Sequence, residues 1–264
     1  MNSLRKFQEK YAAGEKLVVL TGYDALLASY LAEASVDCIL VGDSLSNVIA
    51  GYDSTLPVTM EEMLWHTKMV VRGAGSVPVI ADMPFLSYEI SVEEAVRNAG
   101  RFIKEARATG VKLEGGQTAE RVIKAMTDAN IPVCGHVGMQ PQSFLKLGGY
   151  SVQGRDAAVA ERIKKDALAV QAAGAFAVVL EMVPLELARE ITASLKIPTI
   201  GIGAGPYCSG QVLVTHDLLG LTKQKLKFCK RYAELGKEIN KALSEYVADV
   251  RAGKMPTEEQ AFKK

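Results

Sequence analysis

The chain has 264 residues, of which 48% are hydrophobic and 23% are charged. This is ordinary globular composition, which excludes a disordered or collagen-like chain. Lys and Arg number 31 and Asp and Glu number 30, so the net charge of +1 gives no electrostatic argument for nucleic acid as the main partner.

Short apolar segments alternate with longer amphipathic segments along the chain. Nearly continuous apolar runs are typical of parallel strands that are buried on both faces. They predict strands at residues 17–22, 38–42, 78–82, 110–114, 132–136, 176–181, 198–203 and 211–215. The amphipathic segments predict helices at residues 24–34, 59–72, 91–109, 118–129, 156–173 and 185–195.

This alternation of strands and helices is compatible with two fold classes. About 250 residues is the typical size of an eight-stranded α/β barrel. A doubly wound sheet produces the same alternation, so periodicity alone leaves both open. The sequence contains no linker and no break in composition, so we predict one domain over residues 1–264, with a C-terminal helix at about 232–251.

The N-terminal segment lacks the apolar core of a secretory leader, and no apolar run reaches the ~18 residues that a membrane-spanning helix needs. The cysteines show no CxxC spacing, and two of them lie within apolar strand segments. Free thiols are typical of proteins in a reducing compartment. We therefore expect a cytoplasmic protein without disulfides and without a membrane partner.

Polar side chains stand at the ends of five successive predicted strands. They are Asp43 and Ser44, Asp82, Lys112 and Glu114, His136, and Glu181. In a barrel these side chains would collect at the C-terminal mouth, where such enzymes place their chemistry. One carboxylate at a strand end is more often a helix cap, but five successive strands are harder to explain in that way.

Three of these residues, Asp43, Asp82 and Glu114, are carboxylates on neighbouring strands. Carboxylate oxygen suits a hard cation, and Mg²⁺ typically takes one or two carboxylates together with waters and substrate oxygens. Zinc would require more His or Cys than this mouth offers. The alternative to a metal site is a charge network with Lys112 and arginines.

The other polar residues favour an anionic substrate. Lys112 and His136 could hold the substrate or its developing enolate, although a single histidine is also a common structural group. Glu181 follows the apolar run FAVVLE, so desolvation would raise its pKa towards the range of a general base. The alternative role for Glu181 is an ion pair with a neighbouring basic residue.

Long motifs containing these residues occur in a fixed order. They are LVGDS at 40–44, DSTLPVT at 53–59, ADMPFLSY at 81–88, VKLEGG at 111–116, GHVGMQPQS at 135–143, GGYSVQGR at 148–155, GAFAVVLE at 174–181 and IPTIGIGAG at 197–205. Together they closely resemble the ketopantoate hydroxymethyltransferase family, over roughly residues 11–232. The resemblance implies a (β/α)8 TIM barrel of the phosphoenolpyruvate/pyruvate superfamily with a C-terminal helical extension.

The resemblance also implies roles for the strand-end residues. Asp43 and Asp82 would bind Mg²⁺, and Glu114 would complete the site directly or through water. The residues that would contact the keto acid are Asp43, Ser44, Asp82, Lys112 and His136. Glu181 would be the catalytic base.

The implied reaction transfers a hydroxymethyl group from 5,10-methylenetetrahydrofolate to 3-methyl-2-oxobutanoate through a Mg²⁺-stabilised enolate. Its product, 2-dehydropantoate, leads to pantothenate and coenzyme A. The family also implies a homodecamer of two stacked pentamers. The alternatives are another Mg²⁺-dependent lyase or mutase of the same superfamily, and an inactive ring-forming relative.

The segment GAGPYCSGQ departs from the family pattern at two positions. Pro206 and Ser209 stand where the family commonly has Asn and Asp. A proline removes a backbone donor, so we hypothesise altered use of the folate donor through the loop after the seventh strand. The predicted metal ligands and base are unchanged.

Overall fold

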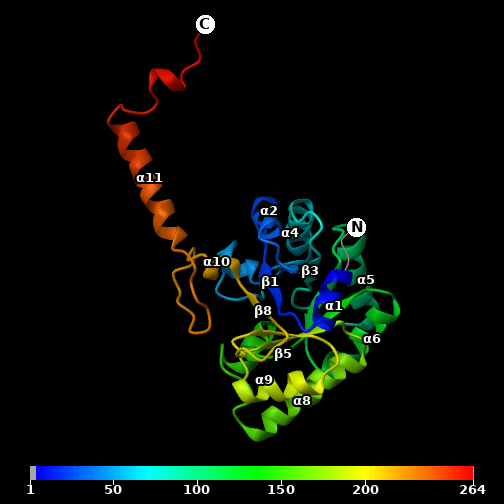
Figure 1. Cartoon of the computed structure of the whole chain (residues 1–264). Coiled ribbons are helices and arrows are strands. Elements are labelled where there is room, and N and C mark those ends of the chain that lie inside the picture. The colour runs from blue at the N-terminus through cyan, green and yellow to red at the C-terminus, as the bar shows by residue number, and fades with distance from the viewer. Residues whose placement is uncertain (1–3, 264) are drawn as a thin grey trace. The chain divides into compact units, whose positions relative to one another are not determined.

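A computed structural model describes residues 4–263 and shows a closed barrel of eight parallel strands (Figure 1). The strands are β1 Leu17–Thr21, β2 Cys38–Val41, β3 Val79–Asp82, β4 Gly110–Glu114, β5 Val133–Gly138, β6 Ala177–Glu181, β7 Thr199–Ile202 and β8 Gly210–Leu213. They pair in chain order, and β1 closes the barrel by pairing with β8. The barrel is thus confirmed, and the doubly wound sheet is wrong.

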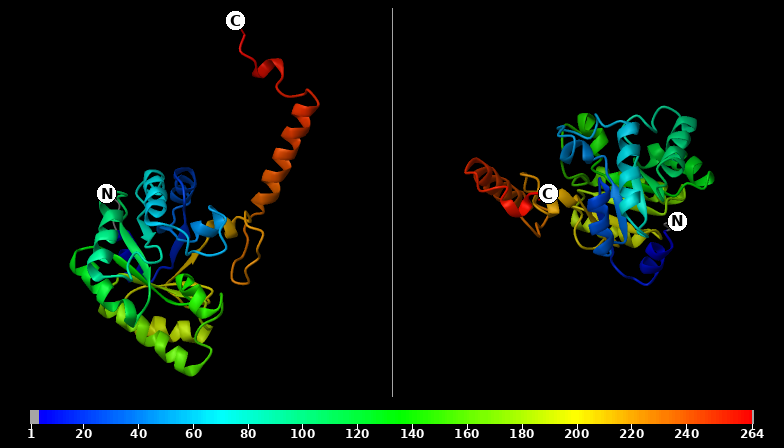
Figure 2. Two further views of the ribbon diagram at one scale, coloured as in Figure 1. Left: turned by 180° about the vertical axis from the view of Figure 1, so that it is seen from behind. Right: turned by 90° about the horizontal axis from the view of Figure 1, so that it is seen from above.

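Helices cover the outside of the barrel, as Figure 2 shows from two further directions. The main ones are α2 Ala25–Glu33, α4 Met60–Gly73, α5 Val92–Lys104, α6 Glu120–Asp128, α8 Ala157–Ala172 and α9 Leu185–Ser194. Side chains of Asp24, Thr59, Ser91 and Asp156 accept hydrogen bonds from the first turns of four of them. Helix α5 ends before the predicted residue 109, and Arg107 takes a left-handed backbone conformation with φ of 59°. Residues 203–209 connect β7 to β8 without a helix.

The side chains along each strand belong alternately to two apolar clusters, because successive side chains point to opposite faces of the sheet. Outward residues such as Ile39, Val111 and Val178 pack beneath the helices. Inward residues such as Leu40 and Val179 form a separate cluster inside the barrel. The inward positions that follow at the C-terminal ends of the strands are polar, so the pleat that builds the core also directs polar side chains into the mouth.

Helix α1, Arg5–Ala12, supplies an aromatic side chain to the base of the barrel. Phe7 is 3% exposed and belongs to the cluster inside the barrel. Its ring meets Phe176 edge to face, with centroids 6.0 Å apart. This contact closes the N-terminal end of the barrel with apolar atoms, opposite to the polar mouth.

The chain divides after Val214 into two compact units. The second contains α10 Thr215–Leu218, α11 Leu235–Arg251 and the 3₁₀ helix Glu258–Gln260. Helix α11 lies within the predicted C-terminal helix, and the single-domain assignment stays a prediction. None of the α11 residues is buried in the described part of the chain. Among residues 4–263, no helix is long and apolar enough to cross a membrane.

Candidate active site

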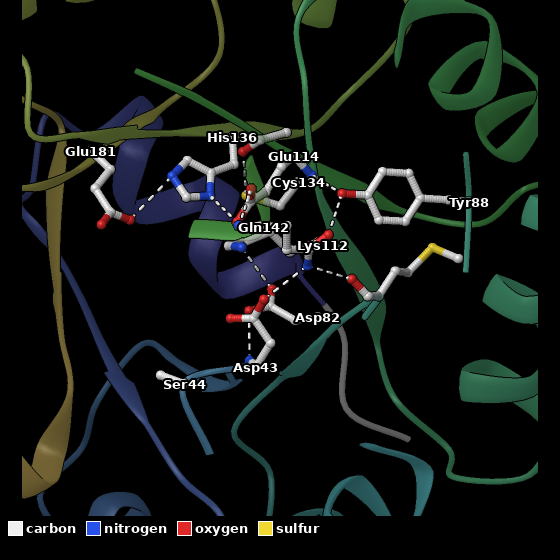
Figure 3. Close-up of polar contacts among 12 residues, drawn as sticks. Asp43, Ser44, Asp82, Tyr88, Lys112, Glu114, Cys134, His136, Gln142 and Glu181 are labelled. Atoms are coloured by element: carbon white, nitrogen blue, oxygen red, sulfur yellow. Dashed lines mark hydrogen bonds and ion pairs between the residues drawn. The ribbon is translucent and has the colours of Figure 1, made fainter. Parts of the chain in front are cut away.

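The strand-end residues from β2 to β6 meet at the mouth of the barrel (Figure 3). Asp43 follows β2, and its backbone N–H donates to Oδ2 of Asp82, the last residue of β3, at 3.0 Å. The other oxygen of Asp82, Oδ1, lies 2.8 Å from Nζ of Lys112 on β4. Asp82 and Lys112 occupy paired register positions, so the pairing of β3 with β4 brings this ion pair together.

Lys112 is a cation held almost completely out of water. Its side chain is 6% exposed and that of Asp82 is 3% exposed. Burial alone would lower the pKa of Lys112, but the carboxylates of Asp82, Asp43 and Glu114 outweigh burial and raise the pKa above its ordinary value. Lys112 therefore stays charged and gives the mouth a fixed positive group.

The carboxyl groups of Asp43 and Glu114 are not fully compensated by this lysine. Burial, followed by the charge of Asp82, raises the pKa of Asp43 to about 7. Burial and the charge of Asp43 raise the pKa of Glu114 well above its ordinary range. Oε1 of Glu114 is buried and makes no hydrogen bond. The mouth therefore holds more buried carboxyl groups than its own cation balances, which favours an added cation.

His136 on β5 lies between two carboxyl groups. Its Nε2 is 3.2 Å from Oε2 of Glu181, and its Nδ1 is 3.6 Å from Oε1 of Glu114, although neither contact is aligned as a hydrogen bond. Burial and the charge of Lys112 lower the pKa of His136 well below its ordinary value, so the ring is neutral. A neutral imidazole has one N–H, so it can donate to only one of these carboxyl groups at a time.

Glu181 ends β6, and its side chain is more exposed than those of the nearby His136, Glu114 and Lys112. Its side chain is 15% exposed, against 2% for His136. Burial raises the pKa of Glu181 to about 7, with a further contribution from Asp82 and an opposing one from Lys112. A carboxylate with this pKa and partial access to the mouth has the properties of a general base.

Ser44 lies beside Asp43 at the end of β2, as predicted. Its Oγ is 2.8 Å from the hydroxyl of Tyr23, a residue just after β1 that is fully buried. This contact fixes the orientation of the serine hydroxyl. Its contact with a keto acid stays a prediction.

Two residues of the site were missed by the sequence analysis. Gln142 lies in the 3₁₀ helix Pro141–Ser143 after β5, and Tyr88 lies in the connection between β3 and α5. Gln142 donates to Oδ2 of Asp43 at 2.8 Å and accepts a hydrogen bond from the hydroxyl of Tyr88 at 2.6 Å. Both stand within motifs of the resemblance, but neither ends a strand and neither is charged, so the ends of the predicted strands gave no signal for them.

The donor set fits a hard cation with water in its shell. Within residues 4–263, no three His, Cys, Asp or Glu side chains converge closely enough to hold a metal ion by themselves. Mg²⁺ needs only one or two protein carboxylates, because waters and substrate oxygens complete its octahedron. The uncompensated carboxyl groups and the unpartnered Oε1 of Glu114 meet that requirement.

Pro206 and Ser209 do not lie at the mouth. Ser209 stands just before β8, and its backbone carbonyl accepts from the N–H of Leu17, the first residue of β1. Its hydroxyl accepts from the N–H of Thr199, the first residue of β7. The carbonyl of Pro206 accepts from Nζ of Lys16, directly before β1. These contacts belong to the base of the barrel, so they give no support to altered donor use.

Comparison with known families identifies the chain. The model of the ketopantoate hydroxymethyltransferase family matches residues 2–258. The chain belongs to the ketopantoate hydroxymethyltransferase family. Several curated relatives of similar sequence carry the name 3-methyl-2-oxobutanoate hydroxymethyltransferase, which is a synonym for ketopantoate hydroxymethyltransferase. The protein of Citrifermentans bemidjiense is 53% identical over 97% of both chains. That of Pelobacter propionicus is 55% identical over 94% of this chain and 92% of its own.

Solved structures of other enzymes share the fold of this ketopantoate hydroxymethyltransferase family member. Phosphonopyruvate hydrolase matches with a TM-score of 0.66 and 14% identity, over 100% of this chain and 92% of its own. The 2,3-dimethylmalate lyase of the PEP mutase/isocitrate lyase superfamily matches with a TM-score of 0.65 and 17% identity, over 99% and 89%. At these identities the likeness concerns the barrel fold alone.

Proposed function

We propose that the chain transfers a hydroxymethyl group from 5,10-methylenetetrahydrofolate to C3 of 3-methyl-2-oxobutanoate and so forms 2-dehydropantoate. Membership of the ketopantoate hydroxymethyltransferase family supports this reaction. The observation that carries it furthest is the position of Glu181, a carboxyl group with a pKa of about 7 at the rim of a mouth that holds a charged lysine and two neighbouring aspartates.

Asp43 and Asp82 would hold Mg²⁺, with Glu114 joining them directly or through a water molecule. When bound there, Mg²⁺ supplies a Lewis acid that polarises the 2-oxo group of the substrate. Lys112 contributes a second positive charge, which would contact the substrate's carboxylate. Ser44 would donate a hydrogen bond to the same molecule.

Glu181 is the proposed base. Its carboxylate removes the proton from C3 of the keto acid, and the electron pair passes to the 2-oxo oxygen to give the enolate. Water hydrolyses the methylene bridge of the folate, which breaks both N–C bonds and releases tetrahydrofolate and a carbon at the oxidation level of formaldehyde. C3 then attacks this carbon, and its oxygen takes up the proton that Glu181 removed, to give the hydroxymethyl group. The neutral ring of His136 has its Nε2 3.2 Å from Oε2 of Glu181, and a small rotation would let it donate to the carboxylate. Because His136 carries no charge, it does not keep Glu181 ionised at low pH.

We also propose that the protein is cytoplasmic and forms a homodecamer of two stacked pentamers. Helix α11 supports an oligomer because Ile239, Leu243, Tyr246 and Val250 form an exposed apolar stripe along it at helical spacing. Sedimentation velocity tests the oligomeric state, and we expect one species at about ten times the mass of a single chain. A monomer at micromolar concentration would contradict it.

The decisive test of the activity is product formation. The full chain would be incubated with 3-methyl-2-oxobutanoate and 5,10-methylenetetrahydrofolate, with Mg²⁺ or with a chelator. We expect 2-dehydropantoate in the presence of Mg²⁺ and a rate at least tenfold lower with chelator. Cleavage of a carbon–carbon bond in a related 2-oxo acid, without transfer, would instead favour a lyase of the same superfamily.

A further inference from the structure

Gln142 connects three strand ends of the mouth through its side chain and its backbone N–H. Its Nε2 donates to Oδ2 of Asp43 at 2.8 Å and to the backbone carbonyl of Met83 at 2.9 Å. Its backbone N–H donates to Oε2 of Glu114 at 3.0 Å. Asp43 follows β2, Met83 follows β3 and Glu114 ends β4, so one residue of the β5 connection reaches each of the three preceding strands.

The orientation of the Gln142 amide is determined by its neighbours. Oε1 accepts from the hydroxyl of Tyr88 at 2.6 Å, and the same hydroxyl accepts from the backbone N–H of Glu114 at 3.3 Å. A turned amide would place Oε1 against the carboxylate of Asp43 and the carbonyl of Met83, three acceptors with no proton between them. All of these groups are buried, with Gln142 6% and Tyr88 5% exposed, so water cannot take over the lost bonds.

The backbone geometry after β5 delivers Gln142 to this position. Gly138 has a φ of 96°, and a Cβ there would lie 2.4 Å from the backbone carbonyl oxygen of Glu181. The next N–H, that of Met139, donates to this same carbonyl at 2.8 Å. Pro141 then begins the 3₁₀ turn that contains Gln142. The chain is therefore anchored to β6 immediately before it crosses to β4 and β2.

Gln142 and Lys112 have different effects on the charge of the carboxylates that they contact. Lys112 neutralises Asp82 with a full positive charge at 2.8 Å. The amide of Gln142 holds Oδ2 of Asp43 without adding charge, which leaves the negative charge of Asp43 available to a cation. A lysine or arginine in place of Gln142 would occupy Asp43 as a competing cation.

From this geometry we propose that Gln142 is a positioning residue of the cation site. It holds Asp43 through a side-chain amide that Tyr88 orients, and it holds Glu114 through its backbone N–H. The inference rests on the proposed function, because it takes Asp43 and Glu114 as groups that face a divalent cation. Removal of an outer partner of a metal ligand typically costs 10–100-fold in metal affinity.

The test measures Mn²⁺ binding to the full chain by electron paramagnetic resonance of the free ion, without any turnover. Gln142→Met keeps the length of the side chain and removes its donors, and it should weaken Mn²⁺ binding by about tenfold or more. Gln153→Met is the matched control, because Gln153 lies in the same β5–α8 connection and its amide donates to Ser151 rather than to a site carboxylate. Its affinity for Mn²⁺ should stay within about twofold of the wild type.

Tyr88→Phe provides a second variant that keeps the ring and removes only the hydroxyl. It should weaken Mn²⁺ binding by a smaller factor than Gln142→Met, because the amide keeps its donors and loses only the bond that orients it. This variant tests the same inference if Gln142→Met fails to fold.

Kinetics separate positioning from a general structural loss. For both variants, the concentration of Mg²⁺ at half-maximal rate should rise, and kcat at saturating Mg²⁺ should recover towards the wild-type value. A fall in kcat that Mg²⁺ does not restore, with unchanged Mn²⁺ affinity, would overturn the inference. Wild-type protein that binds no Mn²⁺ would contradict the proposed cation site itself, whereas wild-type binding with no change in either variant would overturn the role of Gln142 alone.

Discussion

Nε2 of His136 lies 3.2 Å from Oε2 of Glu181, and the imidazole is neutral because it is buried beside Lys112. Glu181 therefore has a polar neighbour that can donate to it but no adjacent positive charge from the histidine. Burial, with a contribution from the charge of Asp82, raises the pKa of Glu181 to about 7 against the opposing charge of Lys112. The relationship makes Glu181 the group whose ionisation is expected to control turnover.

Replacement of Glu181 by glutamine tests its role as the base. The Glu181→Gln variant keeps the shape of the side chain, so it should bind divalent cation and keto acid nearly as the wild type does. The rate of C3 proton exchange should fall by about 10²–10⁴-fold, because the amide cannot accept the proton. Exchange is followed by NMR and binding by calorimetry, and an unchanged exchange rate would remove Glu181 from this role.

The pH dependence of turnover should report the same group. Glu181 must be ionised to act as a base, and burial raises its pKa to about 7. We expect kcat/KM to rise with pH up to about 7 and then to level, with the rate at pH 6 about tenfold below the plateau. A pH profile of the full chain with buffered Mg²⁺ checks this. A rate that stays level down to pH 5 would assign the proton transfer to a group with an ordinary carboxyl pKa.

Stability should depend on pH in the sense opposite to that of ordinary surface carboxylates. Asp43 and Glu181 have ordinary pKa values of 3.8 and 4.5, which the fold raises to about 7. The unfolded chain loses these protons first, so their contribution to the free energy of unfolding is present below about pH 4 and is lost as pH rises through about 7. Denaturant titrations of the metal-free protein across this range should show the decline.

Mg²⁺ should reverse that loss where the carboxyl groups are ionised. A ligand that binds only the folded state stabilises it, and Mg²⁺ binds carboxylates rather than carboxylic acids. The rise in Tm on adding Mg²⁺ should therefore be larger at pH 8 than at pH 5. Equal shifts at the two pH values would indicate a cation site outside the mouth.

Phe7 should matter for stability and not for chemistry. It is buried against Phe176 at the base of the barrel, away from the polar mouth. Phe7→Ala should lower the free energy of unfolding by about 3–5 kcal/mol, while Phe7→Leu, which retains most of the volume, should cost about 1.5 kcal/mol or less. Chemical denaturation gives these values, and kcat per folded chain should match the wild type. A loss of kcat in the folded variant would contradict this separation.

Most of the barrel was predictable because its strands and helices carry local patterns. The apolar runs placed all eight strands to within about two residues, and each capped helix begins at its polar N-cap. Closure of the barrel was not predictable from periodicity, because the pairing of β1 with β8 depends on the whole sheet. The early end of α5 also escaped prediction, since Arg107 adopts a left-handed conformation that a residue of its type rarely takes.

The candidate site was predictable where function coincides with the end of a strand. Asp43, Asp82, Lys112, Glu114 and Glu181 meet as expected because parallel strands end at one rim. Gln142 and Tyr88 could not be inferred in this way, because their positions depend on how the connections after β5 and β3 fold back over the mouth. Ser209 lies at the base of the barrel, which the motif that contains it did not indicate.

The most direct test of the proposed chemistry is proton exchange at C3 of 3-methyl-2-oxobutanoate in D₂O, followed by proton NMR with the full chain. The samples contain Mg²⁺ or chelator, each with and without tetrahydrofolate. We expect loss of the C3 proton signal that depends on Mg²⁺ and on Glu181. Absence of exchange from folded protein under every condition would contradict the proposal that this mouth forms an enolate.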